Sequence, residues 1–458
     1  MNAVANWLLA AVLSVWLFNV IYACRKLKKR LVFFVFHGML FLFLLGRPLI
    51  DWVCAGDWAG LEIRDYGVRE QGITAALLCI LVSMICLLLG SAAAEKSTGH
   101  AAPAPDLGQN TGVIPVIRIW ALAIFAVSVV CEAVFEGEKV LFVLEHSYVE
   151  YYTTYASRLP YWIYVGSSFM EYAACLYLAT LPGLPGSWIV CGVMALTALP
   201  MFLMGNRAVL MLKLVFLFVY LVYRQTQEHG GKWFGKWHCL ALAAALPGMM
   251  VLMNAVNYIR EKTAMAPMSV FEMLLDFVRK QGVTFSWLCA GCSIVDRLRA
   301  LCPVSYTFAS FLEYAGSGMI AQKIFGASPL PTDLVQNALA NHRLDCKLSY
   351  LVLGEAKFLA GHGTGTTYLL EVFSDFGLLG VGVFSLLLGF AMTAAVIKAR
   401  NSMPVRFGLL CTAVKLFYMP RSSAVDCFEF LWRAPFWLLV VSTAAVVWMY
   451  RMLCKRRS

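Results

Sequence analysis

The sequence predicts an all-α, polytopic integral membrane protein with about eleven transmembrane helices and one large helical extracytoplasmic loop. Of its 458 residues, 61% are hydrophobic and only 14% are charged. A soluble domain averages about 25% charged and about 45–50% apolar residues. Apolar runs long enough to cross a bilayer, at about 20 residues each, recur along the whole chain. Basic clusters lie between these runs, which is typical of membrane topology.

The expected spans follow one another along the chain, each as an apolar run bounded by charged, glycine or proline residues. Hydropathy alone sets their bounds. The eleven runs are about 3–23, 31–48, 71–93, 114–136, 161–181, 186–204, 207–223, 239–256, 377–397, 406–420 and 433–450.

Four basic clusters fix the expected orientation. They are Arg25–Arg30, Arg224–Lys236, Lys398–Arg406 and Arg451–Arg457. With eleven spans and an outside N-terminus, all four lie in the cytoplasm, as the positive-inside rule requires. The net charge of +11 therefore favours membrane orientation and no nucleic acid partner. The first apolar run lacks a basic leader and a small-residue cleavage site, so no cleaved signal peptide is expected.

This topology predicts three segments. Residues 1–256 form an N-terminal bundle of about eight spans, and 377–458 hold about three spans with an outer loop at 419–433. Between them, residues 257–376 form a long extracytoplasmic loop. Its stretch "SVFEMLLDFVRK" has apolar residues at helical spacing, so short helices are expected there.

Arginines stand at the outer ends of several spans. Arg207 interrupts the apolar run in "GNRAVL", Arg421 lies in "YMPRSSAVDCFEF", Arg433 in "FLWRAPFW", and Arg158 ends an aromatic outer loop. Each could reach toward lipid headgroups. Arg207 and Arg421 are isolated beside a glycine or a proline, which favours binding of an anion. A guanidinium can form two parallel hydrogen bonds to phosphate oxygens.

A glycine-rich turn precedes the span at 377–397. Its sequence is "GHGTGTTYLLEVFSDFG", where the glycines allow a tight turn with exposed amides before a helix, a ready anion site. Glu371 and Asp375 are four residues apart and share one helical face. Glu371 is either a candidate general base for a sugar hydroxyl or the partner of an arginine. Asp375 is expected to pair with an arginine. His362 is a candidate hydrogen-bond donor to a sugar.

No metal or cofactor is expected. The pair Cys289 and Cys292 in "CAGC" has metal-ligand spacing, but no second pair completes a zinc site. The stretch "ANHRLDCKL" gathers His342 and Arg343 just before the glycine turn. It is either a solvated charged face or part of a binding site.

Three of these stretches resemble bacterial oligosaccharide repeat-unit polymerases of the Wzy type. They are "GNRAVL", the turn "GHGTGTTYLLEVFSDFGLLGVGVF" and the loop "MPRSSAVDCFEFLWRAPFWL". The resemblance implies a metal-independent glycosyltransferase at the outer face of the bacterial cytoplasmic membrane. Its donor and acceptor would be oligosaccharides on undecaprenyl diphosphate. Its candidate protein partners would be a chain-length regulator and a flippase.

The resemblance gives Arg207 and Arg421 the role of holding the pyrophosphate, and extends it to Arg343. Further candidate substrate-binding residues are His342, His362, Arg158, Arg260, Asp426 and Arg433. Two alternatives stay open. A glycan ligase would use the same lipid-linked donor, and a lipid-oligosaccharide flippase or transporter would place ionisable residues deep in the bundle.

Overall fold

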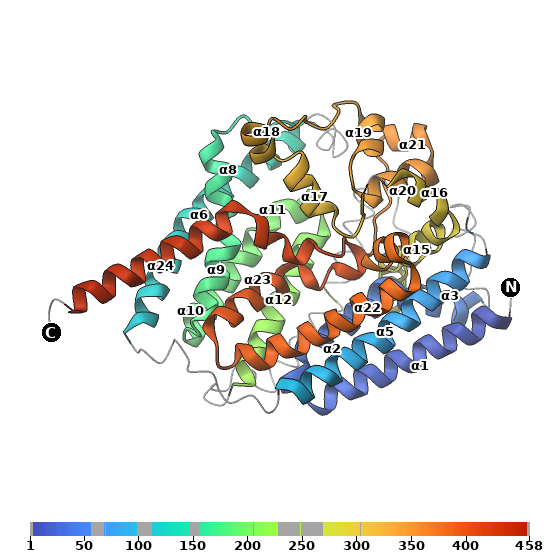
Figure 1. Cartoon of the computed structure of the whole chain (residues 1–458), viewed down its shortest axis with the longest axis horizontal. Coiled ribbons are helices and arrows are strands. Elements are labelled where there is room, and N and C mark those ends of the chain that lie inside the picture. The colour runs from blue at the N-terminus through green and yellow to red at the C-terminus, as the bar shows by residue number, and fades with distance from the viewer. Residues whose placement is uncertain are drawn as a thin grey trace. The chain divides into compact units, whose positions relative to one another are not determined.

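The computed structural model describes most of the chain as helices (Figure 1). The residues it describes are 3–55, 68, 70–98, 112–146, 155–204, 206–227, 248, 269–302 and 304–455, and none of them lies in a strand. Eight helical segments in these ranges are long and apolar enough to cross a membrane. The predicted all-α, polytopic architecture is therefore confirmed.

The eight candidate spans match eight of the eleven predicted runs. They are Val4–Arg25, Leu27–Cys54, Glu70–Thr98, Val113–Glu145, Leu184–Phe202, Ala208–Gln225, Tyr368–Ala399 and Ala434–Lys455. The predicted run at 239–256 lies outside the described residues, apart from position 248. The run at 161–181 is divided into two short helices, and the run at 406–420 corresponds to a helix of 14 residues.

Contacts divide the chain into two compact units. The first comprises Met1–Gly99, Ala266–Ala394 and Leu416–Glu429, and the second comprises His100–Met265, Ala395–Lys415 and Phe430–Ser458. The first unit therefore joins the beginning of the chain to the long segment that precedes the span at 368–399. This interleaving brings residues far apart in the sequence into one unit.

The first unit is built on long helices. Its elements are α1 (Ala3–Arg25), α2 (Leu27–Leu40), the π-helical η1 (Phe41–Leu45), α3 (Gly46–Ala55), α5 (Glu70–Thr98) and most of α22 (Tyr368–Ala399). Helix α5 lies between α1 and α22 (Figure 1). A Cβ on Gly90 would lie 2.0 Å from the Leu386 oxygen, so α5 and α22 approach too closely for any larger residue. Small residues at such a crossing are typical of helix packing in membranes.

Hydroxyls connect α5 to α22. Ser83 Oγ lies 2.7 Å from Tyr368 Oη and 2.8 Å from Ser385 Oγ, and Ser91 Oγ lies 2.7 Å from Thr393 Oγ1. In a hydrocarbon environment such bonds satisfy polar groups that would otherwise be costly. They fix the start of α22 against α5, and this start carries the candidate residue Glu371.

The rest of the first unit is a set of short helices. These are α14 (Val270–Gln281), α15 (Val283–Ser293), α16 (Val295–Leu301), α17 (Ala309–Gly316), α18 (Met319–Phe325), α19 (Leu334–Ala340), α20 (Leu344–Leu353), α21 (Glu355–Leu359) and the 3₁₀ turn η3 (Met419–Arg421). Helix α14 begins with a capping box between Ser269 and Glu272. Helix α15 packs on α5, where a Cβ on Gly72 would lie 2.6 Å from the Cys289 oxygen.

The second unit contains the remaining helices. They are α6 (Val113–Glu145), α8 (Tyr161–Ser168), α9 (Met170–Ala179), α10 (Leu184–Leu196), α11 (Leu199–Leu203), α12 (Arg207–Gln225), α23 (Met403–Leu416) and α24 (Ala434–Lys455), and the 3₁₀ segment η4 (Asp426–Trp432) joins the units in the sequence. Helix α6 packs against α8, α9 and α24. The buried Lys213 of α12 pairs with Glu171 of α9, with Nζ and Oε1 2.7 Å apart. This ion pair offsets the cost of a charge inside an apolar run.

Candidate functional site

Arg421 lies against the junction between α14 and α15. Its Nη1 donates to the backbone oxygen of Gln281 at 2.9 Å. The guanidinium also lies 5.0 Å from the ring centroid of Trp287 and 5.6 Å from that of Phe43. Aromatic faces stabilise a cation and keep its orientation. One edge of the guanidinium is thus engaged by protein, while the planar group keeps further N–H donors for an anion.

Two more arginines approach the same junction. The backbone of Arg47 lies directly against Gly282. A Cβ added to Gly282 would lie 2.9 Å from the Arg47 nitrogen. Arg279 Nε donates to Asp51 Oδ1 at 2.7 Å, and Arg47 Nε lies 3.6 Å from Asp51 Oδ2. Asp51 is therefore shared by two arginines. The Arg47 side chain is 4% exposed, whereas that of Arg279 is 48% exposed.

We call Arg47, Arg279 and Arg421 the arginine cluster. Asp51 pairs with two of its members, Arg47 and Arg279, and Arg421 donates to a backbone oxygen. Guanidinium groups hold phosphate oxygens through paired hydrogen bonds better than any other side chain. The arrangement is suited to a compact anion with several oxygens.

The loop that carries Arg421 is held by Glu371. The carboxylate is 2% exposed, and its Oε2 accepts hydrogen bonds from Ser423 Oγ and the Ala424 amide, both at 2.8 Å. Glu371 lies in the first turn of α22, where the helix dipole also favours a negative charge. These contacts favour a positioning role over proton transfer, because the side chain is buried and Oε2 already accepts two hydrogen bonds.

The glycine turn is shaped by packing. Gly361 has a φ of +82°, which favours glycine, and a Cβ on Gly365 would lie 2.3 Å from the Trp287 ring. The turn thus supports the indole that stacks on Arg421. The expected free amides are not found at three positions, since those of Gly361, His362 and Thr364 donate to Phe358, Lys357 and Ser349 respectively. That part of the anion-site prediction is wrong, and the His362 side chain is exposed.

Asp375 has different partners from the expected arginine. Its two carboxylate oxygens accept from the amides of Tyr306 and Thr307, at 3.1 and 2.7 Å, and from Ser305 Oγ at 2.6 Å. The nearby Arg299 instead donates to the backbone oxygen of Ser374 at 2.9 Å. In the described residues, Asp375 therefore organises the entry to α17 and forms no ion pair.

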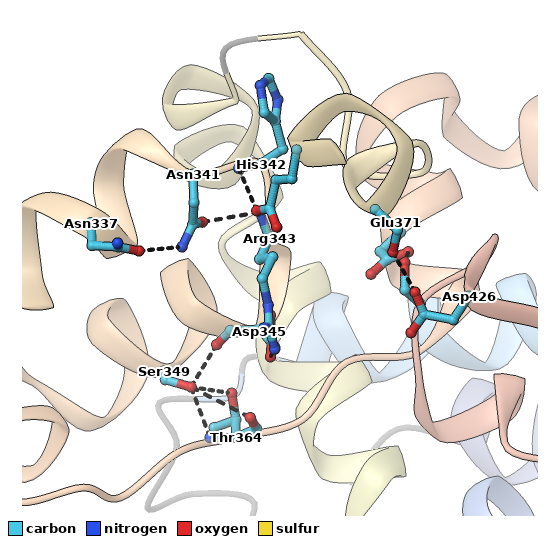
Figure 2. Close-up of polar contacts among 12 residues, drawn as sticks. Asn337, Asn341, His342, Arg343, Asp345, Ser349, Thr364, Glu371 and Asp426 are labelled. Atoms are coloured by element: carbon cyan, nitrogen blue, oxygen red, sulfur yellow. Dashed lines mark hydrogen bonds and ion pairs between the residues drawn. The ribbon is translucent and has the colours of Figure 1, made fainter. Parts of the chain in front are cut away.

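A polar group surrounds the connection between α19 and α20 (Figure 2). Arg343 forms a bidentate pair with Asp345, at 2.6 and 3.1 Å, and its amide donates to Asn341. The His342 amide donates to Glu313 Oε1 at 3.3 Å. Burial lowers the pKa of His342 and raises the pKa of Glu313. Both groups are therefore more readily neutral than in water.

The same close-up places Asp426 beside Glu371 (Figure 2). Ser310 of α17 donates to Asp426 Oδ1, which links α17 to the Arg421 loop. Six of the predicted site residues belong to the first unit: Arg421, Glu371, Asp426, His342, Arg343 and His362.

Other predicted residues belong to the second unit. Arg207 is the first residue of α12, and its side chain lies outside the described part of the structure. Arg260 also lies outside the described residues. The Arg158 amide donates to Glu138 Oε1 at 2.7 Å, with an exposed side chain, and Arg433 is exposed just before α24. The pairing of Arg207 with Arg421 stays a prediction.

Sequence reasoning missed Arg47, Arg279, Trp287 and Glu313. One sequence signal pointed to Arg47. The stretch "GRPLID" places Arg47 and Asp51 four residues apart inside the second apolar run. Charged residues are costly in such a run, so their presence indicates a structural or functional role. Within the described ranges, no group of three His, Cys, Asp or Glu side chains could hold a metal ion. Cys289 and Cys292 are buried free thiols.

Comparison with known proteins gives one match. A family model described as O-antigen polysaccharide polymerase Wzy covers residues 1–457. No curated protein and no solved structure matches the chain.

Proposed function

Since this chain belongs to the Wzy family of O-antigen polysaccharide polymerases, we propose that its arginine cluster holds the diphosphate of a lipid-linked glycan during polymerisation. The family makes it a multi-pass membrane polymerase of oligosaccharide repeat units. The growing glycan on undecaprenyl diphosphate is the donor, and a single lipid-linked repeat unit is the acceptor. The reaction takes place at the outer face of the bacterial inner membrane, with the N-terminus outside and the C-terminus in the cytoplasm.

One observation supports this proposal above the others. Arginines from α3, α14 and η3 lie at the junction between α14 and α15, where two of them share Asp51. A lipid diphosphate presents several anionic oxygens, and its charge increases on one oxygen as the glycosidic bond breaks. Preoriented cations stabilise that charge without reorganisation.

The reaction requires no metal in this scheme. An acceptor hydroxyl oxygen attacks the anomeric carbon, the bond from that carbon to the diphosphate oxygen breaks, and the electron pair leaves on the diphosphate. Arg421 and Arg279 neutralise the departing oxygens, while Trp287 keeps the Arg421 guanidinium oriented. Arg207 is proposed as a further diphosphate-binding residue, because the sequence makes it an isolated charge at the end of a span.

The direct test is reconstitution of the full chain in lipid vesicles. Its substrate is the single lipid-linked repeat unit extracted from cells that lack the polymerase. A ladder of products with increasing repeat number supports the proposal. A single transfer onto a different acceptor would identify a ligase, and transbilayer movement of the substrate without any product would identify a flippase.

Glu371 provides a sharper prediction about the site. We expect Glu371→Gln to retain most of the polymerisation rate, because the amide oxygen still accepts from Ser423 and Ala424. Glu371→Ala should lower the rate by about tenfold or more, since losing a buried acceptor costs about 1–3 kcal/mol and frees the Arg421 loop. Ladder formation per membrane-inserted protein measures both variants.

The matched control is Ser423→Ala, which removes one donor and leaves the carboxylate in place. A smaller loss than in Glu371→Ala is expected. If Glu371→Gln were as inactive as Glu371→Ala while inserting normally, the carboxylate would have to transfer a proton, and the positioning role would be wrong.

A further inference from the structure

We propose that Glu313 is the general base that removes the proton from the acceptor hydroxyl. This inference rests on the proposed function, since it assigns a residue to the glycosyl transfer described above. Glu313 lies in the last turn of α17 and is half-buried. Among the described residues, one hydrogen bond reaches its carboxylate, from the His342 amide to Oε1 at 3.3 Å. Its other oxygen, Oε2, accepts none in that part of the chain.

Four other carboxylates around the site are engaged or buried. Asp51 is shared by two arginines, and Asp345 is paired with Arg343 through both oxygens. Asp375 is held by two amides and a hydroxyl through both oxygens, and Glu371 is 2% exposed and accepts two hydrogen bonds at Oε2. A base needs an oxygen that can reach a substrate hydroxyl. Glu313 keeps such an oxygen and has no cation within 4 Å in the described residues.

Glu313 also lies on the face of α17 that is bonded to the loop carrying Arg421. Ser310 and Glu313 are three residues apart on α17 and therefore lie on the same face of this helix. Ser310 donates to Asp426, which belongs to the loop that carries Arg421. The helix face that bears Glu313 is thus fixed to the loop of the arginine cluster. An acceptor hydroxyl directed at a glycan held there would approach α17.

The surroundings of Glu313 shift the pKa of its carboxyl group. Burial is the largest influence and raises its pKa above the usual value, while the Arg343 charge and the His342 amide act against it. A base whose pKa is closer to the working pH is more effective. The charged and titratable groups that face Glu313 or lie on the elements packed against α17 are Arg343, Asp345, Lys347, His342, Asp426 and the exposed Lys323 of α18.

The step balances as follows. The acceptor O–H bond breaks as its oxygen forms a bond to the anomeric carbon, and the proton passes to Glu313 Oε2. The bond between that carbon and the diphosphate oxygen breaks, and the electron pair leaves on the diphosphate. Glu313 then returns its proton to water. No oxidant, reductant or further reactant is required.

The test compares Glu313→Gln, Glu313→Asp and wild type as full-length protein in vesicles, with extracted single lipid-linked repeat units as substrate. We expect Glu313→Gln to lower kcat by about 10²–10⁴-fold with little change in KM. The wild-type rate should rise with pH as the Glu313 carboxylate ionises, and this rise should be absent in Glu313→Gln. Glu313→Asp, which keeps a base, should retain the rise and part of the rate.

The control is Glu355→Gln, which changes an exposed carboxylate of α21 in the same unit and should leave the rate unchanged. If wild type forms no ladder, the proposed function itself fails. If wild type forms a ladder and Glu313→Gln keeps its rate, or loses rate while keeping the pH dependence, then Glu313 is not the base. Loss in both Glu313 variants with a changed thermal stability would also overturn the assignment.

Discussion

Replacing Arg421 by alanine is expected to abolish the ladder of polymerised repeat units, with a fall in rate of about 10²–10³-fold. This is the magnitude expected when one preoriented donor to a developing oxyanion is removed. Arg421 contributes a guanidinium that is braced by Trp287 and by the Gln281 carbonyl, so its orientation is set before the substrate arrives. Single lipid-linked repeat units should accumulate in the variant.

Two comparisons make this prediction specific. Arg421→Lys keeps a charge but loses the planar fork, so we expect a partial rate between wild type and Arg421→Ala. Arg297→Ala removes an exposed arginine of α16 and should leave the ladder intact. Gel separation of the glycan, normalised to inserted protein, measures all three. A normal ladder in Arg421→Ala would show that the arginine cluster does not act on the diphosphate.

Arg207 extends the same experiment to the second unit. If it binds a diphosphate as proposed, Arg207→Ala should lower polymerisation to a similar degree, measured as ladder formation per inserted protein. Unchanged polymerisation in Arg207→Ala would leave it as a residue at the end of a span.

The spans were predictable because hydropathy is a local property of the sequence. The prediction succeeded best for long helices such as α5 and α6. It was less accurate at 161–181, where Ser167 and Ser168 donate side-chain hydrogen bonds to the carbonyls of Tyr164 and Val165 as α8 ends. Local hydroxyl bonds of this kind compete with the helical ladder.

The site was predictable only in part. Arg421 and Glu371 stood out because a charge in or beside an apolar run needs a reason, and the structure places both in one unit. The partners of these residues could not be predicted. Arg47 contacts Gly282, and Trp287 contacts Arg421, across segments far apart in the sequence. Glu313 lies on a helix that Ser310 bonds to Asp426 of the Arg421 loop.

The second large effect is expected at Asp51, whose carboxylate is 5% exposed and shared by Arg47 and Arg279. We expect Asp51→Ala to destabilise the folded protein by about 3–5 kcal/mol, since it removes one member of a buried ion pair. Thermal unfolding in detergent should show this directly. Asp51→Asn keeps the shape and one acceptor and should cost less.

A double-mutant cycle separates stability from activity at this position. Because the loss arises mainly from the buried Arg47, Asp51→Ala combined with Arg47→Met should recover part of the stability that Asp51→Ala loses alone. Arg279 is 48% exposed, so Arg279→Ala should cost little stability while weakening binding of the lipid diphosphate. A large loss of stability in Arg279→Ala, with none in Asp51→Ala, would show that α14 depends on Arg279 through contacts other than Asp51. In that case Arg279 would have to be assigned to the fold and not to the diphosphate.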